Sequence, residues 1–168
     1  MLVAAKNYEQ ELQSLARMTW YDEKYQYFWC GYYSDLNFHE DDFWHRDFAY
    51  IENGKVKGFF SYKLDRDARS ITSFGLLSFF GPSVAFMNEV MKHIKWLFDA
   101  GIVDRMEFFA FESNPVMRSY QRMVKRFGGK PVGKLTRAMR LYDGKLHNSI
   151  IFEILREDYE EAMKRRNR

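Results

Sequence analysis

The stretch that decides the fold, residues 107–159, reads EFFAFESNPVMRSYQRMVKRFGGKPVGKLTRAMRLYDGKLHNSIIFEILREDY. Its first five residues are apolar enough for a buried strand, and Asn114-Pro115 then opens a basic amphipathic helix with Asn114 as its cap. Gly128-Gly129 closes that helix. The stretch ends with a strand over Lys130–Leu141, a tight turn at Asp143-Gly144-Lys145 and a last strand over Ser149–Leu155.

Upstream, the pattern predicts two helices, a meander of three strands and a third helix. The meander contains an Asn53-Gly54 turn signal, and Ser83 can cap the long helix that follows it. The expected elements are a short strand at Leu2–Ala5, helices at Tyr8–Arg17 and near Thr19, strands at Asp47–Ile51, Val56–Leu64 and Ile71–Phe80, and a helix up to Ala100. The fold class is therefore α+β, with a mixed, mostly antiparallel sheet of six to seven strands and about four helices.

Length and composition restrict the class of protein further. The chain of 168 residues is most simply one domain, residues 1–168. Cys30 is the only cysteine, which excludes an internal disulfide and a Cys-rich metal site and fits a reducing cytoplasm. No apolar run is long enough for a membrane span. No metal site is expected, because the spacing of His39 and His45 fits no common zinc pair.

Charge is distributed unevenly, although the net charge is only +3. Residues 20–53 hold eight acidic and two basic side chains, together with many aromatic ones, whereas residues 113–142 hold eight basic side chains and no acidic one. Such asymmetry can build one negative and one positive surface. These charges could equally be solvated faces. The small net charge makes nucleic acid an improbable partner, although the basic segment keeps a nucleic-acid-binding domain open as an alternative.

The order of elements, the Asn114-Pro115 opening, the Gly128-Gly129 closure and the ending from Asp143 to Tyr159 resemble the GNAT superfamily of acyl-CoA N-acyltransferases. The resemblance covers nearly the whole chain. It implies a sheet splayed between its two central strands, acetyl-CoA as co-substrate, and a small-molecule or peptide amine as acceptor. The acidic, aromatic N-terminal segment would wall the acceptor side and favour a cationic amine. A homodimer is left open.

The resemblance also implies residues that bind the cofactor. The family's pyrophosphate loop corresponds to residues 78–83, where the backbone approaches the phosphates and free helical N–H groups face them. Ser78 and Pro82 depart from the family's pattern, and Pro82 removes one N–H group. The residues carried over as cofactor-binding are Phe79, Gly81, Ser83, Val84, Ala85, Asn114 and Arg122.

Two residues are carried over as catalytic. Tyr120 would be the general acid for the departing thiolate, although a core tyrosine is the competing interpretation. The strand before the long helix holds no acid, so Glu112 or the cluster His39–Asp42 would have to serve as general base. No Ser/His/Asp nucleophile arrangement is expected. A GNAT fold that has lost turnover and acts as a binding module is the alternative to an enzyme.

Overall fold

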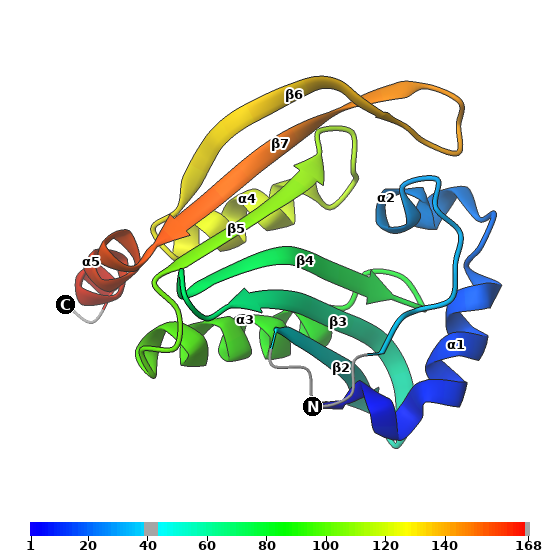
Figure 1. Cartoon of the computed structure of the whole chain (residues 1–168), viewed down its shortest axis with the longest axis horizontal. Coiled ribbons are helices and arrows are strands. Elements are labelled where there is room, and N and C mark those ends of the chain that lie inside the picture. Colours follow the sequence, from blue (N-terminus) through cyan, green and yellow to red (C-terminus); the bar gives the residue numbers. More distant parts are fainter. Residues whose placement is uncertain (39–43, 167–168) are drawn as a thin grey trace.

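A computed structural model describes residues 1–38 and 44–166 of the chain. The elements follow one another as β1 (Leu2–Ala4), a 3₁₀ turn (Ala5–Tyr8), α1 (Glu9–Met18), a 3₁₀ turn (Glu23–Tyr25), α2 (Gln26–Trp29), β2 (His45–Glu52), β3 (Lys55–Asp65), β4 (Ser70–Ser78), α3 (Val84–Asp99), β5 (Arg105–Phe111), α4 (Met117–Arg126), β6 (Lys130–Arg140), β7 (Leu146–Leu155) and α5 (Arg156–Arg166). Figure 1 shows the sheet, with the β6–β7 hairpin arching along one edge.

The seven strands form one sheet in the order β1-β2-β3-β4-β5-β7-β6. Every neighbouring pair is antiparallel except β4 and β5, which are parallel and pair only at Ser70–Arg105 and Ile71–Met106. Beyond these two pairs the strands diverge, and in Figure 1 they separate toward α2. The expected α+β class and the splay between the two central strands are both confirmed.

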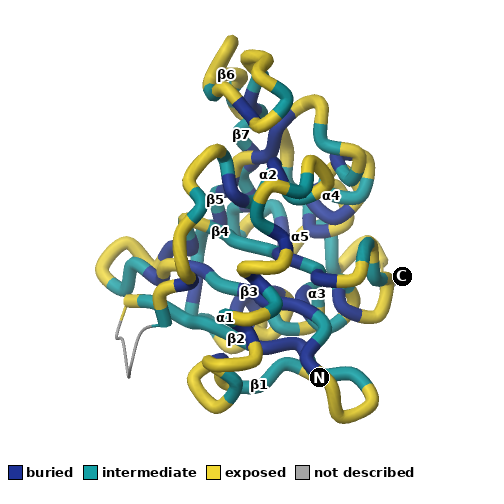
Figure 2. The backbone as a smooth tube through the Cα atoms, turned by 90° about the vertical axis from the view of Figure 1, so that its right-hand side faces the viewer, coloured by how far each residue is buried: buried dark blue, intermediate teal, exposed yellow. Residues whose placement is uncertain are grey.

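Alternating side chains of the sheet pack into two hydrophobic cores, one on each face. On β3, Phe59 packs with Leu12 of α1 and Trp29 of α2, whereas its neighbour Phe60 packs with α3 and α4. This division follows from strand geometry, in which successive side chains point to opposite faces. Figure 2 shows the burial concentrated in the central strands, while β6 is mostly exposed.

Two helix predictions need correction. The helix expected to start at Pro115 begins at Met117, because the Asn114 side chain accepts a hydrogen bond from the Val116 N–H at 3.1 Å and closes a turn first. The helix over Arg156–Arg166 was not predicted, because its sequence is mostly charged and has no apolar face of its own.

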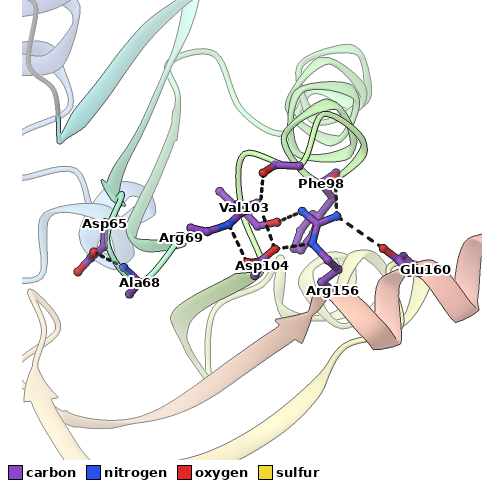
Figure 3. Close-up of polar contacts among 9 residues, drawn as sticks. Asp65, Ala68, Arg69, Phe98, Val103, Asp104, Arg156 and Glu160 are labelled. Carbon is purple, nitrogen blue, oxygen red and sulfur yellow. Dashed lines mark hydrogen bonds and ion pairs between the residues drawn. The ribbon is translucent and has the colours of Figure 1, made fainter.

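Arg156 explains why this last helix stays on the domain (Figure 3). Its guanidinium pairs with Asp104 and donates to the carbonyl oxygens of Phe98, at 3.0 Å, and of Val103. The backbone N–H of Arg156 also donates to the Asp104 carbonyl oxygen at 2.8 Å. The start of α5 is thereby fastened to the connection between α3 and β5.

Within the described ranges, no helix has the length and apolar character that a membrane span requires.

Candidate functional site

The splay between β4 and β5 opens into a cleft with a volume of about 1050 Å³. Residues 74–78 of β4 and residues 108–111 of β5 form its two sides, and residues of α2, α3 and α4 complete its walls. Because β4 and β5 do not pair beyond Ile71 and Met106, their facing backbone edges keep N–H and C=O groups free of each other. An extended, amide-containing ligand can pair with such edges as an added strand would.

One end of the cleft suits an anion. Ser83 caps α3, and its hydroxyl accepts from the Phe86 N–H at 3.1 Å. The first two N–H groups of this 16-residue helix, those of Val84 and Ala85, have no acceptor in residues 1–38 and 44–166. Arg122 and Arg126 of α4 line the same cleft. Free helical N–H groups and guanidinium groups together favour phosphate.

The loop before α3 is held in a fixed shape. Gly81 has a φ of +90°, and the Ser78 hydroxyl donates to its carbonyl oxygen. The Phe79 N–H donates to the Lys57 carbonyl oxygen at 3.0 Å, and the Phe79 carbonyl accepts from the Tyr25 hydroxyl at 2.7 Å. The backbone groups of Phe79 are therefore engaged within the protein.

The structure brings most of the sequence-predicted binding residues to one cleft. Those that line it are Gly81, Ser83, Val84, Asn114, Tyr120 and Arg122. Phe79, Ala85 and Glu112 are not among the lining residues.

Tyr120 projects from α4 into the cleft beside Phe108, with the two rings 5.9 Å apart and nearly perpendicular. Burial raises the pKa of its hydroxyl to about 12. Elsewhere in the described residues no group hydrogen bonds to this hydroxyl. It is therefore a neutral proton donor that faces the cleft without a competing partner.

Glu112 lies in a different environment. Its carboxylate is exposed, pairs with the Lys134 ammonium at 2.8 Å and accepts from the Asn148 side chain at 2.9 Å. These two contacts, that with Lys134 first, lower its pKa. A carboxylate that is stabilised as the anion and faces away from the cleft is poorly suited to take a proton there.

Acidic and aromatic side chains reach the cleft from α2 and from the 3₁₀ turn before it. Asp22, Glu23, Tyr25, Tyr27 and Phe28 all line it. Glu23 is exposed, and its carboxylate has no partner among the residues that the structure describes. The cluster His39–Asp42, which the sequence offered beside Glu112 as an alternative base, lies outside the described residues. Asp22 and Glu23 belong to the acidic, aromatic segment 20–53, but the sequence did not single them out within it.

A serine, a histidine and an aspartate that are distant in the sequence are hydrogen bonded to one another in the structure. His147 lies between Ser113 and Asp143, 2.5 Å from the serine hydroxyl and 3.0 Å from the carboxylate. Ser113 lies in the β5–α4 loop, Asp143 in the β6–β7 turn and His147 near the start of β7. The turn places Asp143 beside His147, and the antiparallel pairing of β5 with β7 brings Ser113 to them.

No protein-family model matches the sequence, and no curated protein matches it. Solved structures do match its fold. A spermidine N-acetyltransferase from Vibrio cholerae, in complex with CoA and spermine, superposes with a TM-score of 0.69 at 13% identity, covering 95% of this chain and 97% of that one. A protein described as a probable acetyltransferase gives a TM-score of 0.67 at 16% identity, over 95% and 93% of the two chains.

A third match, to a protein described as a putative acetyltransferase, has a TM-score of 0.57 at 21% identity. The aligned region covers 74% of this chain and 66% of that one, which is just under two thirds of its length. These similarities, together with the splayed sheet, show the fold: the chain has the GNAT fold.

Proposed function

We propose that this protein is an N-acyltransferase that moves an acetyl group from coenzyme A to a cationic amine. The observation that carries the proposal is the splay of β4 from β5, which opens a cleft with an anion-binding end, unpaired strand edges and a free tyrosine hydroxyl. The matched Vibrio cholerae enzyme was solved with CoA bound, which supports acetyl-CoA as the co-substrate.

Each part of the cleft has a role in this reaction. The N–H groups at the start of α3, with Arg122 and Arg126, hold the pyrophosphate and phosphate charges. The edges of β4 and β5 pair with the amides of the extended arm, which places the thioester near Tyr120. The amine attacks the carbonyl carbon, the C–S bond breaks, and Tyr120 donates its proton to the departing thiolate. Holding the amine next to the thioester supplies most of the rate acceleration.

The acceptor side of the cleft suits a positive charge. Asp22 and Glu23 provide negative charge, and Tyr25, Tyr27 and Phe28 provide ring faces that attract a cation. Among the carboxylates on this wall, Glu23 is the one with no partner in the described part of the chain, so it can bind the ammonium group and accept its proton. Spermine, bound in the Vibrio cholerae enzyme, is an acceptor of this chemical type.

The experiment measures acetyl-CoA binding and turnover separately. Binding is followed by the rise in melting temperature, since a ligand that binds only the folded state stabilises it. Turnover is followed by thiol release with spermine, a neutral amine and an acidic amino acid. We expect a preference for spermine that weakens in Glu23→Gln and at high salt. Glu157→Gln, which removes the same charge from exposed α5, should leave the preference unchanged.

The second candidate function is a GNAT-fold module that binds coenzyme A without turnover. The Ser78 and Pro82 substitutions in the loop before α3 favour it, because Pro82 cannot donate a hydrogen bond to a phosphate. A melting-temperature shift without thiol release would favour this module over the enzyme. If millimolar acetyl-CoA causes no shift in the folded protein, both candidates are excluded.

A further inference from the structure

Ser113, His147 and Asp143 form a continuous hydrogen-bonded chain beside the cleft. The Ser113 Oγ lies 2.5 Å from His147 Nδ1, and His147 Nε2 lies 3.0 and 3.1 Å from the two carboxylate oxygens of Asp143. The serine is exposed, whereas the histidine side chain is only 9% exposed. An exposed hydroxyl backed by a buried imidazole and a carboxylate is the order found in nucleophilic serine sites.

The contacts fix the protonation pattern of the imidazole. A carboxylate can only accept, so His147 Nε2 must carry the hydrogen that faces Asp143. In the neutral ring, Nδ1 then holds the lone pair and accepts the Ser113 hydroxyl proton. The arrangement therefore directs the serine proton to a base and leaves the oxygen lone pairs free. The nitrogen order is reversed relative to the serine proteases, but the role of each group is the same.

The surrounding residues hold this chain in place. The Lys145 N–H donates to Asp143 Oδ1 at 3.0 Å, and this bond, followed by the one from His147, lowers the Asp143 pKa. The buried Gln26 of α2 accepts from the Asp143 N–H at 3.2 Å. Asp143 is thus positioned as an anion from three directions, which orients the imidazole.

The site borders the cleft without being part of its lining. Tyr27, which lines the cleft, donates its hydroxyl to the Ser113 carbonyl oxygen at 3.1 Å, and its ring meets the His147 ring edge-on at 6.2 Å. Phe111, also in the lining, contacts the same imidazole edge-on, with ring centroids 6.5 Å apart, and also contacts the Tyr27 ring at 6.2 Å. Ser113 follows Phe111 by two residues, at the open end of β5.

We propose that Ser113 is a nucleophile that accepts acyl groups from activated esters, with His147 as general base and Asp143 as the orienting anion. The Ser113 oxygen attacks the acyl carbonyl while His147 Nδ1 takes its proton. The bond to the leaving group breaks, and the leaving group departs with that proton from His147. Water then attacks the acyl-serine, His147 takes a proton from the water, and the carboxylic acid and the serine hydroxyl are released.

This activity is independent of acetyl transfer to an amine, so the two can be tested apart. The probe is p-nitrophenyl acetate, which needs no coenzyme A site. We expect a stoichiometric burst of nitrophenolate, followed by slower release, and the mass of one acetyl group on the peptide that contains Ser113. This measurement locates the acetyl group in the protein without substitutions, so it does not depend on whether a variant folds.

Variants then separate catalysis from bracing of the hairpin. Ser113→Ala should abolish the burst, and His147→Ala and Asp143→Asn should each slow acylation by roughly 10²-fold or more. Ser34→Ala removes an exposed serine that contacts no histidine in residues 1–38 and 44–166, and it should keep the full burst. No burst in the unmodified protein, acetylation at other side chains, or a burst that survives Ser113→Ala would overturn the proposal and leave the three residues as a brace between the loop and the hairpin.

Discussion

Gly128 closes α4 at a position where any side chain would meet the backbone of α5. Its φ is +79°, and a β-carbon built on it would lie 2.2 Å from the Asp158 carbonyl oxygen and 3.2 Å from the Ala162 β-carbon. Because the first of these atoms is backbone, it cannot turn aside as a flexible side chain would. Gly128→Ala must therefore displace α5 as well as strain its own φ.

The cost has two parts. Holding alanine in the left-handed region costs about 1–2 kcal/mol. Displacing α5 disturbs Tyr159, which is 2% exposed and stacks on Phe98 at a centroid distance of 4.7 Å. Partial loss of one buried aromatic side chain costs about 2–3 kcal/mol. We therefore expect Gly128→Ala to lower the free energy of unfolding by about 3–5 kcal/mol, a large share of the total for a domain of this size.

Urea denaturation followed by circular dichroism measures this change, with Gly54→Ala as the matched control. Gly54 has a φ of +73°, but a β-carbon there meets nothing within 4 Å. In the control, the free energy of unfolding should fall only by the cost of the backbone strain, about 1–2 kcal/mol. The difference between the two variants therefore measures the contact with α5. Equal losses in the two variants would refute the close packing of α4 against α5.

Three further predictions concern single side chains. Tyr120→Phe should lower thiol release roughly 10²-fold or more with an unchanged melting temperature, and unaltered turnover would return Tyr120 to a packing role. Burial lowers the pKa of His93 to about 4, so the unfolded chain binds a proton first as the pH falls. The contribution of His93 to the free energy of unfolding is fully present above about pH 6.5, and it decreases by roughly 3 kcal/mol as the pH falls toward 4. Urea titrations should show this slope, and His93→Gln should remove it. Arg156→Met should cost about 1–3 kcal/mol, because it leaves the Val103 carbonyl oxygen without its donor and removes one of the donors to the Phe98 carbonyl oxygen and to Asp104. Arg165→Met, at an exposed position of α5, should change the same urea midpoint little.

The element order could be read from the sequence because each signal is local. Asn53-Gly54 marks a turn, Ser83 caps α3 as expected, and the alternation in β3 follows from the period of a strand. The helix at Arg156–Arg166 was missed because its stability comes from contacts of Arg156 and Tyr159 with α3, which are distant in the sequence. The hydrophobic periodicity of a segment shows only the apolar face of that segment, and it contains no information about polar contacts with distant segments.

The site could be predicted only where it follows from the backbone. Ser83 and Asn114 reach the cleft because they end the segments next to the splayed strands. Glu112 was expected to serve as base from its place at the end of β5, but Lys134 of β6 lies close enough to pair with it. That pairing depends on strand register, and β6 carries register shifts that no sequence pattern announces.

The same register explains how one strand end serves two kinds of chemistry. Pairing of Phe111 with Ser149 fixes the end of β5 against β7, and residues 108–111 line the cleft up to this point. The chain then leaves the sheet, and Ser113 meets His147, two residues before Ser149 on the partner strand. If the pairing of β5 with β7 shifted by one residue, Phe111 and His147 would no longer lie on the same face of the sheet. The apolar wall of the cleft and the hydrogen-bonded serine are therefore specified together, and neither can be rearranged in evolution or by design without moving the other.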